Sequence, residues 1–102
     1  MNTEDSPPLD EQSFVASTTD QSVWVRVAVK GGILGVQLEP GVMRRPGHEI
    51  AQRIMACADA AYLEGQVALR THAEKAHVDP ESLAGMATPS DLEQARARLR
   101  EL

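Results

Sequence analysis

The segment from Ser22 to Leu38 reads SVWVRVAVKGGILGVQL, a pattern that specifies two β-strands joined by a tight turn. Apolar residues alternate with other residues before Gly31-Gly32 and resume after it, which is typical of a β-hairpin with one buried face. Two adjacent glycines favour a two-residue type I′ turn, because both of its central positions need a positive φ. The pairs predicted on the buried face are Val25 with Leu38, Val27 with Val36 and Val29 with Leu34.

The other face of this hairpin is mixed in character. It is predicted to pair Trp24 with Glu39, Arg26 with Gln37 and Ala28 with Gly35. Such a face is either a solvated surface that carries one aromatic side chain or a contact surface, since tryptophan is enriched at protein interfaces. The sequence leaves both interpretations of Trp24 open.

The flanking sequence predicts a two-layer α+β fold. A short strand over Ser13–Ser17 completes a three-stranded antiparallel meander, because a hairpin alone is marginal in water. Pro46 is suited to the start of a helix. Residues 47–76 contain no proline and are rich in strong helix formers. We therefore expect a long α-helix that packs on the sheet, and a short C-terminal helix after it.

The length of this helix suggests a partner. About thirty helical residues span roughly 45 Å, whereas a compact domain of this size has a radius of gyration of about 13 Å. Either the helix breaks near Gly65, or its far half projects and packs on something else. The second interpretation has a candidate contact, a stripe of small residues formed by Ala58, Ala61, Gly65 and Ala68. The alternative is an amphipathic helix that lies on its own sheet.

The chain divides into three segments within one domain. Residues 1–12 are predicted to be a disordered acidic leader. Residues 13–77 hold the sheet and the long helix, and residues 78–102 form a linker and the C-terminal helix. In this last segment, Thr88-Pro89-Ser90-Asp91 has the pattern of a capping box.

The net charge of -5 is concentrated at the two ends of the chain. Residues 23–78 hold seven basic and five acidic side chains, which leaves that body slightly basic. This balance argues against strong general nucleic-acid binding, which needs many phosphate neutralisations. The chain shows no signal-peptide pattern and no apolar run that could span a bilayer. With a single cysteine, Cys57, it is predicted to be cytoplasmic.

No pattern of catalytic, cofactor-binding or metal-binding residues is present. His72 and His77 are five residues apart, which does not match the spacing that places two metal ligands on one helix face. Cys57 falls on an apolar helical stripe, where a small core residue is expected. The sequence therefore predicts a protein that is not an enzyme and needs no cofactor.

One basic pair has two interpretations. Arg44-Arg45 directly precede a predicted helix N-terminus, where free N–H groups and the helix dipole attract anions. The pair could contact a phosphate or a carboxylate of a partner. The simpler interpretation is two solvated arginines on a turn.

Several motifs together resemble the YbaB/EbfC family of small nucleoid-associated homodimers. The motifs are a short strand, a V-x-V-x-V strand that ends in a glycine turn, a strand of V-x-[IL]-[DE]-P type and an Ala-rich helix. They correspond here to Phe14–Ala16, Val23–Val29 with Gly31, Val36–Pro40 and Glu49–Ile54. The stretch from Leu34 to Arg53 is most similar to divergent actinobacterial members that are associated with type VII secretion, the Esp-type proteins.

The resemblance implies a YbaB-like fold and a dimer formed with itself or with a homologous YbaB-like protein. It gives two function classes. The first is a cytosolic interaction module that supports secretion-system proteins through Trp24 and the small-residue stripe. The second is a DNA-binding protein that would use Arg26, Arg44, Arg45 and Arg53. This chain lacks the family's long N-terminal helix and much of its basic character, which favours the first class.

Overall fold

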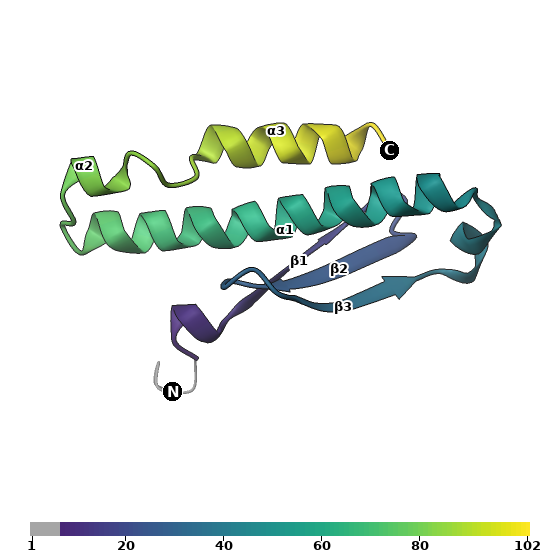
Figure 1. Cartoon of the computed structure of the whole chain (residues 1–102), viewed down its shortest axis with the longest axis horizontal. Coiled ribbons are helices and arrows are strands. Elements are labelled where there is room, and N and C mark those ends of the chain that lie inside the picture. The colour runs from purple at the N-terminus through teal and green to yellow at the C-terminus, as the bar shows by residue number, and fades with distance from the viewer. Residues whose placement is uncertain (1–6) are drawn as a thin grey trace.

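The computed structural model describes residues 7–102 and has the predicted α+β architecture (Figure 1). The molecule is elongated, with principal extents of 49 × 33 × 20 Å. A three-stranded antiparallel sheet is followed by a long helix and by two shorter helices at the C-terminal end. The strands are β1 (Ser13–Ser17), β2 (Val23–Ala28) and β3 (Ile33–Leu38), and the helices are α1 (Gly47–Lys75), α2 (Pro80–Leu83) and α3 (Pro89–Arg100).

The sheet has the strand order β1-β2-β3, as expected for a meander. Phe14 of β1 pairs with Val27 of β2, which confirms the predicted first strand. The alternate valines of β2 are all buried, because this central strand turns one face toward α1. The core residues that it contributes are Val23, Val25 and Val27.

The predicted register of the hairpin is wrong by two to three residues. Val25 pairs with Val36 and Val27 pairs with Ile33, so that Leu34 is the extra residue of a bulge. The cause lies in the turn. Gly31 adopts a φ of 106° and its N–H donates to the Ala28 carbonyl at 2.8 Å, which closes a three-residue loop over residues 29–31 instead of a two-residue type I′ turn.

Helix α1 is continuous from Gly47 to Lys75, so of the two alternatives the break near Gly65 does not occur. Gly65 lies over Phe14 and Val29, where a Cβ atom would come within 3.0 Å of the Phe14 ring. The glycine therefore permits close packing of α1 on β1 and does not kink the helix. The C-terminal end of α1 projects beyond the sheet, where α2 lies beside it (Figure 1).

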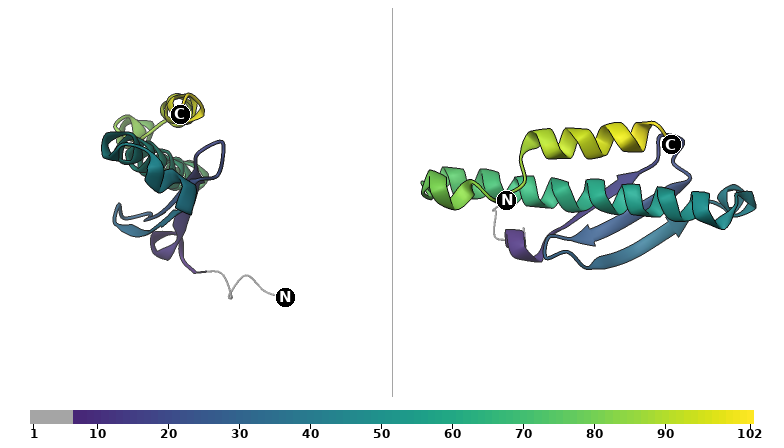
Figure 2. Two further views of the ribbon diagram at one scale, coloured as in Figure 1. Left: turned by 90° about the vertical axis from the view of Figure 1, so that its right-hand side faces the viewer. Right: turned by 45° about the horizontal axis from the view of Figure 1, so that its top comes forward.

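The helices cover only part of the sheet. Helix α1 packs mainly against β1 and β2, and α3 packs against α1. A hollow lined by Ala16 of β1, Ala60 of α1 and Leu99 of α3 places α3 on the β1 side of α1. The left view of Figure 2, which looks along the long axis, shows the same offset, with α3 and β3 on opposite sides of α1. Strand β3 is consequently the uncovered edge of the sheet.

The C-terminal segment forms as its local signals predict. The Thr88 hydroxyl accepts a hydrogen bond from the Asp91 N–H at 3.1 Å, and the Asp91 carboxylate accepts one from the Thr88 N–H at 2.9 Å. This capping box starts α3, whose buried face is formed by Leu92, Ala95 and Leu99. The Arg70 guanidinium of α1 donates to the carbonyls of Leu83 and Met86 and holds the α2 region against α1.

The predicted disordered leader is ordered in its second half. Leu9–Glu11 form a short 3-10 turn, and the Gln12 carbonyl accepts a hydrogen bond from the Val29 N–H at 3.0 Å. This bond ties the leader to the hairpin loop. The prediction for residues 1–6 lies outside the described part of the chain. A second 3-10 turn, Pro40–Arg44, connects β3 to α1 and buries Val42.

Candidate interaction surface

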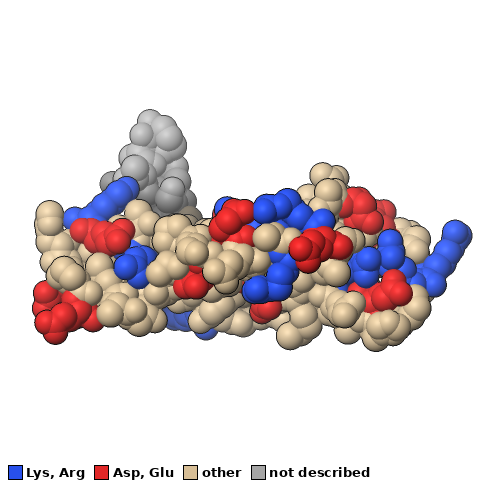
Figure 3. All heavy atoms as spheres, turned by 90° about the horizontal axis from the view of Figure 1, so that it is seen from above, with Lys and Arg blue, Asp and Glu red and all other residues tan. Residues whose placement is uncertain are grey.

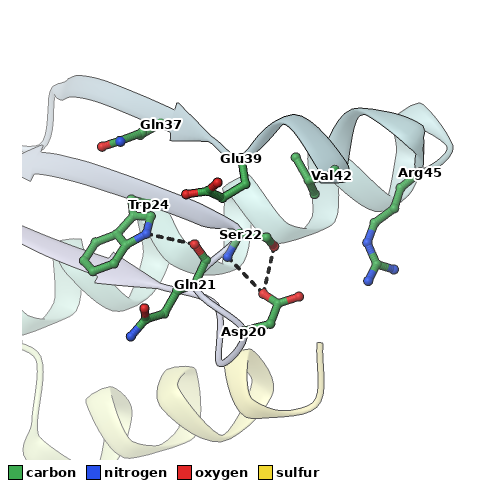
Figure 4. A pocket seen from close by; sticks show the side chains of 9 residues that line it. Asp20, Gln21, Ser22, Trp24, Gln37, Glu39, Val42 and Arg45 are labelled. Atoms are coloured by element: carbon green, nitrogen blue, oxygen red, sulfur yellow. Dashed lines mark hydrogen bonds between the residues drawn. The ribbon is translucent and has the colours of Figure 1, made fainter.

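Trp24 lies on the face of the sheet that no helix covers, at the wall of a hollow of about 710 Å³. Figure 4 shows the indole at one end of this hollow and Arg45 at the other, with Glu39 between them. The indole N–H donates to the Gln21 carbonyl at 3.0 Å, which leaves the ring half-buried against the sheet. The structure is consistent with the predicted exposure of one aromatic ring on this face.

A tight turn between β1 and β2 lines one part of the hollow. The Asp20 carboxylate accepts hydrogen bonds from the Thr18 hydroxyl, the Ser22 hydroxyl and the Ser22 N–H at 2.7–3.0 Å. These bonds stabilise the charged form and lower the pKa of Asp20 to about 2. The carboxylate therefore stabilises the turn, in which Gln21 adopts a φ of 61°.

The small-residue stripe on α1 is used within the chain. Ala61 and Gly65 are buried against the sheet, while Ala58 and Ala68 are half-buried at its borders. A partner helix has no access to the centre of this stripe. The alternative interpretation, an amphipathic helix that lies on its own sheet, is the one that the structure shows for this part of α1.

The four arginines proposed for anion or DNA contact do not form one surface. Arg26 lies on the uncovered sheet face and donates to the Ser13 hydroxyl at 3.0 Å. Arg44 and Arg45 are exposed where the second 3-10 turn leads into α1, and Arg45 forms an ion pair with Glu49 at 3.3 Å. Arg53 is only 7% exposed, so the proposed role in nucleic-acid contact is wrong for this residue.

Arg53 has a structural role instead. Its guanidinium donates to the Glu49 carbonyl at 3.1 Å and to the Leu102 carbonyl at 3.3 Å. The second bond joins α1 to the segment that follows α3. The sequence could not reveal this contact, because its two partners are 49 residues apart.

The surface that the sequence analysis missed is an apolar strip along β3 and the neighbouring flank of α1. Leu34 and Val36 were assigned to the buried face, yet both are exposed, because α1 covers β1 and β2 rather than β3. On α1, Met55 and Tyr62 are spaced by seven residues and lie on the flank next to β3. We call the exposed residues Ile33, Val36, Met55 and Tyr62 the β3–α1 strip.

A groove of about 420 Å³ runs between the two elements of this strip. Its lining includes Ile33 on the sheet side and Met55, Ala58 and Tyr62 on the helix side. A second groove of about 640 Å³, between α1 and the end of α3, shares Met55 and Asp59 with the first. The first groove lies on the β3 side of α1 and the second on the α3 side, and the charged Asp59 borders both. The one sequence signal for it is the absence of any charged residue from Gly31 to Leu38.

Metal ligands do not gather in the part of the chain that is described. No group of three or more His, Cys, Asp or Glu side chains gathers within residues 7–102 in a way that could hold a metal ion. Burial raises the pKa of the Cys57 thiol to about 11, so this side chain is a poor nucleophile at neutral pH. Cys57 packs in the core with Val23, as expected from its place on the apolar stripe.

The face that carries α3 shows basic and acidic side chains interspersed rather than a field of one sign (Figure 3). Ion pairs across it include Arg96 with Glu64 and Arg100 with Glu93. This pattern does not form the basic stripe that nucleic-acid binding requires. Among the described helices, none is long and apolar enough to cross a membrane.

Comparison of the chain with protein-family models, curated proteins and solved structures found no match. The similarity to YbaB/EbfC proteins and to their Esp-type members therefore stays a prediction from the sequence.

Proposed function

We propose that this protein is a non-enzymatic interaction module that acts in the cytosol as part of a dimer and supports type VII secretion-associated proteins. The observation that carries the proposal is the exposed β3–α1 strip. Single exposed apolar residues are common on monomers, but here four large apolar side chains are exposed near one another. Exposed apolar patches of this kind mark interaction sites. The secretion context rests on the sequence resemblance alone.

The elongated shape supports the same proposal. A radius of gyration of 15.4 Å is larger than the roughly 13 Å typical of a compact domain of this length. The sheet is covered on one face only, and α1 extends past it (Figure 1). A partner chain would bury apolar surface that this single chain leaves in contact with water.

Light scattering coupled to size exclusion tests this function. The purified chain, of 11.1 kDa, is expected to elute with twice that mass at micromolar concentration, or to do so with a homologous chain when the two are co-expressed. A monomer at every concentration, with no partner recovered at fixed stoichiometry on a tagged chain, would reject the proposal.

DNA binding is the second candidate, and the exposed Arg26, Arg44 and Arg45 are the residues that favour it. A gel-shift titration between 50 and 200 mM salt separates the two candidates, because phosphate contacts weaken steeply over that range. Saturable binding with a steep salt dependence, lost in Arg44→Gln/Arg45→Gln, would favour the DNA-binding function. We expect weak or no binding, since Asp20 and Glu39 line the same hollow as Arg45.

A further inference from the structure

We propose that the β3 edge binds an extended segment of a different protein, which adds a fourth strand to the sheet in antiparallel orientation and carries an acidic side chain opposite Gly35. This inference rests on the proposed interaction function and states how a supported protein is held. The evidence is the backbone of β3, the apolar side chains on the helix side of its edge, and the charge of Arg26.

The outer side of β3 offers backbone groups to a further strand. β3 ends the strand order of the sheet, and nothing within residues 7–102 pairs with its outer side. The Glu39 N–H donates to the Ser22 carbonyl at 2.9 Å, which fixes the direction of bonding at this end of the strand. Successive residues of an antiparallel ladder bond alternately to one side and to the other. Gln37 therefore bonds to β2, and Val36 and Leu38 direct their N–H and C=O groups outward.

This edge is not protected against strand addition. Edge strands of monomeric proteins are commonly blunted by charged side chains, by proline or by a covering element. The segment Ile33–Leu38 contains no charged residue and no proline, and Val36 at its centre is exposed. An extended segment laid along it would exchange main-chain hydrogen bonds with Val36 and Leu38, as in other complexes formed by strand addition.

The helix side of the edge sets the apolar positions of the bound segment. Val36 lies opposite the buried Val25, so its side chain is on the helix side of the sheet, and Leu38 shares that side. Residues of the added strand that lie opposite Val36 and Leu38 point to the same side. There they cover Val36 and border the groove that is lined by Met55 and Tyr62. The bound segment therefore needs apolar side chains at alternate positions.

The other face of the sheet sets the position of the acidic residue. Gly35 lies opposite Arg26, and both line a hollow of about 230 Å³ together with Trp24. A Cβ atom on Gly35 would meet nothing within 4 Å, so no side chain stands between Arg26 and an added strand. The residue opposite Gly35 lies two strand spacings from the Arg26 backbone, about 9.5 Å, which a glutamate and an arginine side chain span together.

The charge of Arg26 selects a different protein over a second copy of this chain. The exposed Arg26 side chain donates to the neutral Ser13 hydroxyl at 3.0 Å, and no ion pair within residues 7–102 includes it. A carboxylate opposite Gly35 forms a charge-assisted hydrogen bond with it. The β3 of a second copy has no acidic residue between Ile33 and Leu38 and cannot supply this group. The segment that fits has the order apolar, any residue, apolar, acidic, apolar.

Peptides of defined sequence test this inference. The probe is acetyl-KVTVEVTS-amide, in which the glutamate takes the place opposite Gly35 and the two preceding valines the places opposite Val36 and Leu38. The matched control has lysine in place of the glutamate. In NMR titrations of the isotope-labelled chain, we expect the lysine peptide to bind at least tenfold more weakly than the probe, because like charges at a contact are unfavourable.

Charge-reversal variants of the chain locate the contact. Arg26→Glu should invert the preference, so that the lysine peptide binds at least tenfold more tightly than the probe. Arg44→Glu is the control, because Arg44 is exposed and lies outside the edge, and it should leave the preference unchanged. If Arg26→Glu loses its far-UV circular dichroism signal, Arg26→Gln replaces it and should bind the two peptides equally.

N-methylated peptides separate strand addition from a merely apolar contact. In the expected pairing, the peptide valine opposite Val36 donates its N–H to β3, whereas the threonine before it directs its N–H away. N-methylation of that valine should abolish binding, and N-methylation of that threonine should retain it. Amide hydrogen exchange at Val36 and Leu38 should slow when the probe binds, while exchange at Gln37, which already bonds to β2, should stay unchanged.

The failures of the two proposals are distinguishable. Absence of probe binding at millimolar concentration, equal binding of the glutamate and lysine peptides, or equal binding of the two N-methylated peptides overturns strand addition. Exchange at Val36 and Leu38 that slows with rising concentration of the chain alone assigns the edge to a second copy and also overturns it. In each case the interaction function stands if light scattering or co-purification still finds a partner at fixed stoichiometry, and falls if neither does.

Discussion

Gly65 of α1 lies so close to Phe14 of β1 that a Cβ atom at position 65 would stand 3.0 Å from Phe14 Cδ2. The same atom would stand 3.3 Å from Cγ2 of Val29, which lies in the hairpin loop. One missing side chain thus allows the long helix to approach two segments of the sheet layer. This contact sets how α1 lies across the strands.

Gly65→Ala is expected to destabilise the protein, although alanine is the better helix former by about 1 kcal/mol. Steric conflict in a packed core costs about 1–3 kcal/mol, and we expect it to prevail here by about 1 kcal/mol. Urea unfolding measures the change. Gly47→Ala is the control in the same helix, because an added Cβ meets nothing within 4 Å there. Stability equal to or above that of the wild type in Gly65→Ala would contradict the close contact.

Arg53→Met should lower the free energy of unfolding by about 1–3 kcal/mol, because two carbonyls lose charge-assisted hydrogen bonds. The loss should be accompanied by faster hydrogen exchange in the last turn of α3, since Arg53 binds the Leu102 carbonyl. Arg44→Met is the matched control, as Arg44 is exposed. Equal stability of the two variants would show that the Arg53 contacts contribute nothing.

Asp20→Asn should reduce stability at neutral pH by roughly 1 kcal/mol, a modest value because the carboxylate is exposed and screened by solvent. The pKa of Asp20 is lowered from 3.8 to about 2, so its contribution is complete above about pH 5 and is lost as the pH falls through 2. The difference between wild type and variant should therefore vanish across that window. Thermal unfolding as a function of pH measures it, with Asp79→Asn as the control for loss of one exposed carboxylate. A difference that stays constant from pH 7 to pH 2 would contradict this origin.

Cys57 should resist thiol reagents in the folded protein and react fully once the chain unfolds. Burial excludes the reagent and raises the thiol pKa to about 11, which leaves almost no thiolate at pH 8. Labelling with a chromogenic disulfide reagent, with and without urea, measures both states. Ala84→Cys places an exposed thiol on the same chain and should label at once. Equally fast labelling of Cys57 without urea would contradict its burial.

Local sequence signals predicted the elements well. The valines of β2, the proline before α1 and the capping box of α3 each act within a few residues, so their structural effect can be read directly along the chain. The hairpin register was wrong because the same Gly-Gly pair is compatible with two loops. Choosing between them depends on the contacts of Val29, whose N–H and carbonyl bind Gln12 and Gln66.

The candidate site was less predictable. Trp24 was placed on the uncovered face of the sheet, but the small-residue stripe turned out to be internal and Arg53 buried. Both differences arise from how α1 is rotated and shifted over the sheet. No pattern within α1 itself encodes that choice, since its flanks carry apolar residues on more than one side.

The amino-acid sequence by itself determined the order of the elements, the buried face of β2 and the boundaries of α1 and α3, because these follow from side-chain periodicity, proline and capping over short distances. Only the tertiary structure decided that α1 covers β1 and β2 and leaves β3 bare. That outcome depends on the contact of Gly65 with Phe14 and on α3 occupying the β1 side, which join residues tens of positions apart. The exposed β3 edge is the consequence, and it is the surface on which the proposed interactions rest.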